Sequence, residues 1–80
     1  MSGHDFDPRK WVRIAADLRG QITSGSLPPG GRLPTVAELA ALHHVGAGTI
    51  TKAVHALVDE GLVLDVRGMG WYVRDRAVGA

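Results

Sequence analysis

Residues 35–61 read TVAELAALHHVGAGTITKAVHALVDEG, and this stretch decides the fold. Thr35 and Glu38 stand three residues apart at the head of an apolar-periodic run, which is the spacing of a capping box. That spacing predicts a short helix from Thr35 to about His43. The residues expected to face the core from this helix are Leu39 with either Ala40 or Leu42.

A second helical pattern begins after a short break at His44–Gly46. Apolar residues recur with the helical period from Ala47 to Glu60, and Gly61 suits the position that follows a helix. The expected buried face is formed by Ile50, Ala53, Val54, Leu57 and Val58. A short helix joined tightly to a longer one is typical of a helix-turn-helix.

The residues before this pair predict another helix. Pro8 suits a position at or just before its start, the helical pattern is clear from Trp11, and Ser24-Gly25 ends it. Its apolar stripe consists of Trp11, Ile14, Ala15, Leu18 and Ile22. Two prolines and two glycines in residues 26–31 then enforce a turn, and Arg32-Leu33 is expected to be a short extended piece.

After Gly61 the pattern changes to two β-forming runs, residues 62–66 and 71–74, around a glycine-rich turn. This order predicts a β-hairpin. The expected fold is mainly α with a small β-hairpin, a three-helix winged helix-turn-helix over residues 9–74. Residues 1–8 are expected to be a flexible lead, and residues 75–80 a tail.

Composition narrows the function classes. The 80 residues carry 45% hydrophobic and 21% charged side chains, which is typical of one globular domain. With no cysteine, and with four histidines that lack ligand spacing, no metal or other cofactor is expected. The start lacks the pattern of a signal peptide and no apolar run could cross a bilayer, so the cytoplasm is expected. Nothing in the sequence supports an enzyme.

The outward face of the third predicted helix is the candidate contact surface, because the second helix of a helix-turn-helix lays its N-terminal half in the DNA major groove. With Ile50 inward, the helical period points Gly48, Lys52, His55 and Asp59 outward, flanked by Thr49 and Thr51. Glycines at its start allow backbone N–H groups to approach a phosphate. A plain solvated helix face explains the same pattern equally well.

The turn of the hairpin places Arg67 beside Gly68 and Gly70. An arginine at a narrow tip can enter a minor groove, and glycines allow close approach of the backbone. An arginine that only solubilises a tight turn is the alternative interpretation.

The segment Trp11–Val73 resembles the DNA-binding domain of the GntR family of bacterial transcription regulators. Its most distinctive string is LPPGGRLPT at residues 27–35, and Glu60-Gly61-Leu62-Val63 continues the match in register. The resemblance implies a repressor or activator that binds palindromic operators as a dimer. It also implies a metabolite-binding C-terminal domain, which these residues do not include.

The resemblance also assigns contact residues. Thr49, Lys52, Arg67 and Gly68 match positions that commonly contact DNA, and Thr35 matches a helix cap that can reach a phosphate. Three arginines that the family usually carries are absent, because Ala37, Ala47 and Thr51 stand in their places.

The leading hypothesis is therefore a sequence-specific regulator, most readily a repressor, whose partner is a double-stranded DNA operator and not a membrane. The alternative is a winged-helix protein-interaction module that has lost most DNA affinity, which the missing arginines and the net charge of +1 suggest. The candidate DNA-binding residues are Thr49, Lys52, Arg67, Thr51, His55, Gly68, Gly48, Ala47, Thr35 and Arg32.

Overall fold

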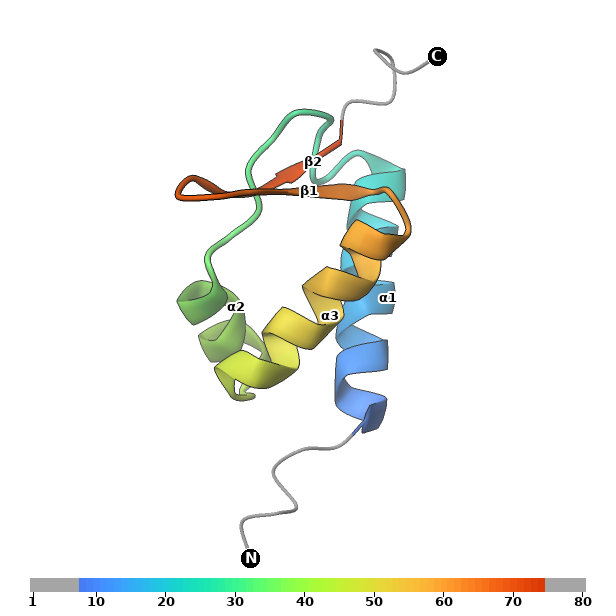
Figure 1. Cartoon of the computed structure of the whole chain (residues 1–80). Helices are drawn as coiled ribbons and strands as arrows, with labels where there is room; N and C mark the ends of the chain where they lie inside the picture. The colour runs from blue at the N-terminus through green and yellow to red at the C-terminus, as the bar shows by residue number, and fades with distance from the viewer. Residues whose placement is uncertain (1–7, 75–80) are drawn as a thin grey trace, which may run out of the picture.

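The structure, a computed structural model, describes residues 8–74. Three helices are followed by a hairpin (Figure 1). The elements are α1 (Pro8–Ser24), α2 (Val36–His43), α3 (Ala47–Asp59), β1 (Val63–Val66) and β2 (Gly70–Val73). The expected lead, apart from Pro8, and the expected tail lie outside the described residues.

Helix α1 begins at Pro8, which confirms the predicted start, and its apolar stripe opens three residues later at Trp11. Proline is favoured in the first turn of a helix because its missing N–H would have no partner there. The apolar stripe faces the core as expected, with Trp11 and Ile22 half-buried at its two ends. Gly25 ends the helix in the left-handed region, at φ 91°.

The capping box of α2 is confirmed. The backbone N–H of Glu38 donates to the hydroxyl of Thr35 (3.1 Å), and the backbone N–H of Thr35 donates to the carboxylate of Glu38 (2.8 Å). Leu39 is buried and Ala40 packs against the core, whereas Leu42 is 68% exposed. Of the two alternatives for the second core position, Ala40 is therefore the right one.

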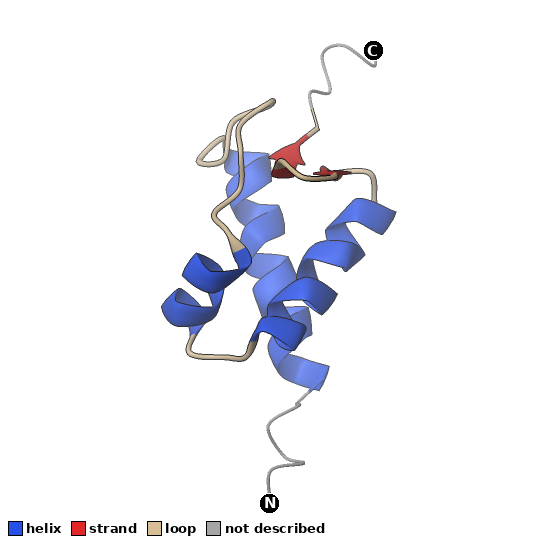
Figure 2. Ribbon diagram, turned by 60° about the vertical axis from the view of Figure 1, so that its left-hand side comes forward, coloured by secondary structure: helices blue, strands red, loops and turns tan. Residues whose placement is uncertain are grey.

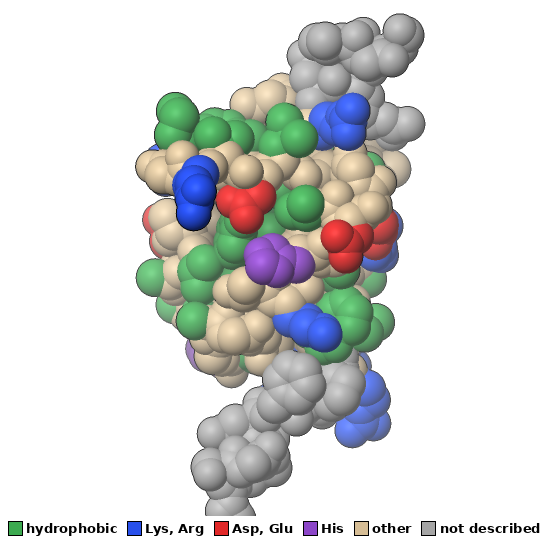
Figure 3. All heavy atoms as spheres, in the orientation of Figure 1, with side chains coloured by type: hydrophobic (Ala, Val, Ile, Leu, Met, Phe, Trp, Pro, Cys, Tyr) green, Lys and Arg blue, Asp and Glu red, His purple; other side chains and the backbone are tan. Residues whose placement is uncertain are grey.

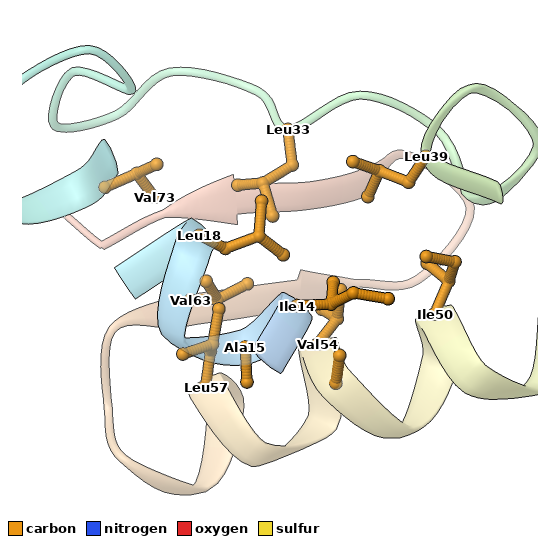
Figure 4. Close-up of a cluster of buried hydrophobic side chains, with 11 residues drawn as sticks. Ile14, Ala15, Leu18, Leu33, Leu39, Ile50, Val54, Leu57, Val63 and Val73 are labelled. Carbon is orange, nitrogen blue, oxygen red and sulfur yellow. The ribbon is translucent and has the colours of Figure 1, made fainter. Parts of the chain in front are cut away.

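Helix α3 carries the centre of the core. Its predicted apolar face is confirmed: Ile50, Ala53, Val54 and Leu57 are buried, and Val58 packs beside them. Figure 4 shows side chains from all three helices and both strands, with Leu33 of the connecting loop, pointing toward one another. Gly61 follows the helix at φ 82°, as the sequence predicts.

The hairpin is antiparallel and lies across the ends of α1 and α3 (Figure 2). Strand β2 begins at Gly70, one residue earlier than predicted, because Gly70 pairs with Val66. The extended piece predicted at Arg32-Leu33 is confirmed, since Arg32 forms a bridge with Tyr72. The piece is held where the N–H of Leu33 donates to the carbonyl of Trp71 (2.8 Å).

Three helices and a hairpin on one core make this fold a winged helix-turn-helix, and the predicted fold class is confirmed. The hairpin is called the wing below. Within residues 8–74, no helix combines the length and the apolar character that a membrane span requires.

Candidate nucleic-acid interface

Parts of three elements lie on one side of the molecule. The start of α2, the first turns of α3 and the turn of the wing all lie toward the left of Figure 1. The loop before α2 joins this group, since Arg32 and Thr35 line the same surface hollow of about 610 Å³ with Leu42. We call this group of elements the contact face.

The start of α3 carries no large side chain. Gly46 is its N-cap and makes no side-chain cap hydrogen bond, and Gly46, Ala47 and Gly48 are all exposed. A Cβ atom added at Gly46 or Gly48 would meet nothing within 4 Å, so the packing of the chain does not require glycine at either position. The first backbone N–H groups of a helix have no partner within it. A surface can therefore come very close to this end of α3.

The two threonines of α3 are less available than the sequence suggests. Thr49 is only 5% exposed, so the expectation that its side chain flanks the outward face is wrong; it packs beside Ile50 in the buried set. Thr51 is half-buried, and its hydroxyl donates to the carbonyl of Ala47 (3.0 Å). Its donor is engaged, which leaves its methyl group and oxygen lone pairs for a partner.

Lys52, His55 and Asp59 are exposed on α3, as predicted. The ammonium of Lys52 lies 5.4 Å from the centroid of the Trp11 ring on α1. The apolar stripe of α1 predicts a core position for Trp11 and gives no sign of this contact, because no pattern along the chain reports which residues of two different helices meet. On the face of the molecule that Figure 3 shows, basic, acidic and histidine side chains are scattered and form no continuous basic patch.

The turn of the wing is exposed and rich in glycine. Arg67 and Gly68 lie at its tip, with Gly68 at φ 80°, and Met69 is 59% exposed. Arg32 reaches the base of the same turn: a Cβ atom on Gly70 would come within 3.1 Å of its Nε. The absence of a side chain at Gly70 therefore leaves room for the guanidinium of Arg32 against the wing.

A third arginine is neutralised on another part of the surface. Arg19 of α1 donates through Nε to one carboxylate oxygen of Glu60 (2.8 Å) and through an Nη nitrogen to the other (2.5 Å). These hydrogen bonds, with the attraction of the opposite charges, lower the pKa of Glu60 and raise that of Arg19, while partial desolvation opposes both shifts. Arg19 is thus not a free cation.

A second hollow, also of about 610 Å³, lies between α1 and the joint of α2 with α3. It is lined by Lys10, Arg13, Ile14, Ala16, Asp17, His43, His44 and Val45. Within the described part of the chain, no three His, Asp or Glu side chains are grouped as metal ligands. Neither hollow therefore presents the donor set of a metal centre.

Comparison with known proteins gives one consistent result. Residues 11–73 match the family model described as bacterial regulatory proteins, gntR family. The chain is similar to the HTH-type transcriptional repressor YtrA of Bacillus subtilis (strain 168), with 32% identity over 76 residues that cover 90% of this chain and 58% of YtrA. It is also similar to the mannosyl-D-glycerate transport/metabolism system repressor MngR of Escherichia coli (strain K12), with 35% identity over 82% of this chain and 28% of MngR. The chain thus spans little more than half of YtrA and under a third of MngR.

Solved structures agree. The crystal structure of the AraR DNA-binding domain in complex with operator ORR3 has a TM-score of 0.77 and 33% identity, and covers 80% of this chain and 77% of that one. A putative GntR-family transcriptional regulator has a TM-score of 0.78 and 42% identity over 84% of this chain and 26% of its own. With the family model matched from Trp11 to Val73, this chain belongs to the gntR family of bacterial regulatory proteins.

Proposed function

We propose that this chain is the DNA-binding domain of a bacterial transcription regulator that acts in the cytoplasm by binding an operator in double-stranded DNA. The observation that carries the proposal is the contact face, where the start of α3, the start of α2 and the tip of the wing lie on the same side of the molecule. The similar AraR domain was crystallised with operator DNA. Because YtrA and MngR are named repressors, repression is the proposed outcome.

Each part of the contact face has a proposed role. The first turns of α3 enter the major groove, where Ala47 and Gly48 allow close approach and Lys52 and His55 supply polar contacts. Arg67 and Gly68 at the wing tip meet the backbone or the minor groove. Thr35 and Arg32 contact a phosphate near the start of α2. Thr51 contributes its methyl group, and Thr49 supports the helix from inside.

Few cations are placed to contact DNA phosphates, so one copy of the chain should bind DNA weakly. Phosphate neutralisation supplies much of the affinity of DNA-binding proteins, and the contact face holds only Arg32, Lys52 and Arg67. We propose that two copies bind a palindromic operator together, because two half-sites would combine two weak contacts. The chain has no proposed catalytic step.

The experiment is an NMR titration with two duplexes, one selected from a random library by the chain and one of scrambled sequence. Amide shifts should concentrate in residues 46–55 and 67–70, with tighter binding to the selected duplex. Lys52→Ala and Arg67→Ala should each weaken binding several-fold. Arg74→Ala, which removes one exposed charge at the end of β2, is the matched control and should change it little.

The alternative function is interaction with another protein, and the same titration tests it. Two large apolar side chains, Leu42 and Met69, are more than half exposed near the contact face. If no duplex shifts any amide even at low salt, DNA binding is refuted, and these side chains become the first place to look for a protein partner.

A further inference from the structure

Lys52 is the single cation among the exposed side chains of α3, and it does not extend freely into solvent. Its Nζ lies 5.4 Å from the centroid of the Trp11 ring. Trp11 is half-buried in the first part of α1 and packs against the core, so its ring is a fixed platform. Two helices far apart in the chain thus combine to hold one ammonium group.

The kind of contact matters for what Lys52 can still do. A carboxylate partner, such as Glu60 for Arg19, neutralises its cation and takes up N–H donors. An aromatic face attracts a cation through its quadrupole and leaves the charge in place. The ammonium therefore keeps its full charge and its donors for a further partner.

The contact also limits the motion of the side chain. A lysine has a flexible four-carbon stem, and holding it still on binding costs conformational entropy. A lysine that already rests on a ring has lost part of that freedom in the free protein. That part of the entropy loss has then already occurred on folding, so it no longer opposes binding, and the affinity for DNA is higher.

We propose that Trp11 is a positioning residue for DNA binding, which holds the Lys52 ammonium where it meets a phosphate beside the first turns of α3. The inference rests on the proposed function and adds to it a residue of α1 that lies outside the contact face. Trp11 acts through Lys52 and need not touch DNA.

The size of the effect follows from the strength of the contact. An exposed cation–π contact contributes about 0.5–1 kcal/mol, which corresponds to a roughly two- to fivefold change in affinity. Trp11→Leu keeps an apolar side chain on the core but removes the ring. It should weaken binding to the selected duplex by about that factor, and Trp11→Phe, which keeps an aromatic face, should recover part of the loss.

A double-mutant cycle separates positioning from general damage. Lys52→Met removes the ammonium and keeps the aliphatic stem. If Trp11 acts through Lys52, Trp11→Leu should weaken binding in the wild-type chain and have almost no effect in the Lys52→Met chain. Equal losses in both backgrounds would show that Trp11 only supports the fold, and the proposal would be rejected.

Ile22→Ala is the matched control, because Ile22 also packs half-buried against the core from α1 but lies at the far end of the helix. Any loss of affinity that it causes should be the same with Lys52 or Met at position 52. A dependence on residue 52 as strong as that of Trp11→Leu would mean that the cycle reports global stability, which would overturn the assignment.

A second readout does not need DNA. In the free chain, the ring current of Trp11 should shift the Lys52 ε-methylene resonances upfield, and Trp11→Leu should remove the shift. Unshifted resonances in the wild-type chain would refute the contact itself. The proposed function and the role of Trp11 can be refuted separately. A wild-type chain that binds no duplex refutes the proposed function. A chain that binds, but in which the affinity losses of Trp11→Leu and Lys52→Met add, refutes only the role of Trp11.

Discussion

His44 ends α2 with φ 58° and ψ 46°, and among residues 8–74 it is the single non-glycine with positive φ. A side chain with a Cβ atom pays about 1 kcal/mol in this left-handed conformation, whereas glycine adopts it without steric cost. His44→Gly should therefore raise the free energy of unfolding by up to about 1 kcal/mol, as measured by urea denaturation.

The same substitution elsewhere gives the control. His55 lies in the regular part of α3 and is exposed, so His55→Gly should lower the free energy of unfolding by roughly 0.4 kcal/mol through lost helix propensity. Opposite signs at the two positions are the expected result. A destabilised His44→Gly chain would mean that the imidazole makes a contact worth more than the backbone strain.

Gly48 and Gly20 form a second matched pair. Both are exposed glycines inside helices, and a Cβ atom would meet nothing within 4 Å at either one. Gly20→Ala should stabilise the chain by about 0.5–1 kcal/mol and Gly48→Ala by part of that, because Gly48 is in the first turn. Only Gly48→Ala should weaken DNA binding, since its methyl group stands on the contact face. Equal DNA affinity for both variants would remove Gly48 from the interface.

Single residues show where sequence reasoning is weakest. The helical period placed Lys52 and His55 outward correctly, but it misjudged Thr49, which sits at the edge of the apolar face and is covered by neighbouring elements. Whether such an edge residue is exposed depends on how the helices pack, and periodicity within one helix does not contain that information. The Trp11–Lys52 contact escaped prediction for the same reason.

At the scale of elements, Arg19 and Glu60 join α1 to the end of α3 across the surface. Their side chains are 40% and 39% exposed, so water screens the pair and its coupling should be roughly 0.2–1 kcal/mol. The folded-state pKa of Glu60 is lowered from 4.5. The coupling is therefore fully present above the ordinary pKa of glutamate and is lost as the pH falls through the lowered value.

A double-mutant cycle of Arg19→Met and Glu60→Gln, followed by urea denaturation, measures that coupling. It should be favourable at pH 7 and close to zero at pH 3 or below. The cycle removes the separate effect of taking a negative charge from the end of α3. A coupling that is unchanged across this range would show that the pair is not an ion pair in solution.

Elements were predicted best where a local signal marks their ends. The capping box at Thr35 and the glycines at positions 25 and 61 located helix boundaries correctly, because each acts through neighbouring backbone groups. The start of β2 was missed by one residue, since it depends on pairing with Val66 and not on the β-propensity of Gly70.

At the scale of the whole molecule, the net charge of +1 says little about binding, because the distribution of charge decides it. Three cations on the contact face predict a shallow salt dependence, with log Kd changing by about 2–4 per tenfold change in salt for one copy. Fluorescence anisotropy at several salt concentrations would measure the slope. On a duplex that carries one half-site and so binds one copy, a slope above about 6 would mean that the basic residues of α1 also reach phosphates.

The fold as a whole was predicted because independent local signals and the family resemblance agree in register over residues 11–73. The arrangement of the candidate interface was predicted only in outline. Arg67, Lys52 and His55 lie exposed on the expected elements, but the nearness of Arg32 to Gly70 arises from a bridge between distant segments. No pattern within either segment reports it.

That bridge ties the loop before α2 to the wing. The N–H of Leu33 donates to the carbonyl of Trp71, and the N–H of Val73 donates to the carbonyl of Gly31, each at 2.8 Å. Strand β2 is thus enclosed between β1 and the loop. Leu33 and Val73 should therefore release their amide protons to heavy water in one shared opening event, at nearly the same rate although they are far apart in the chain. We therefore expect β2 and the loop that carries Arg32 to open as one unit.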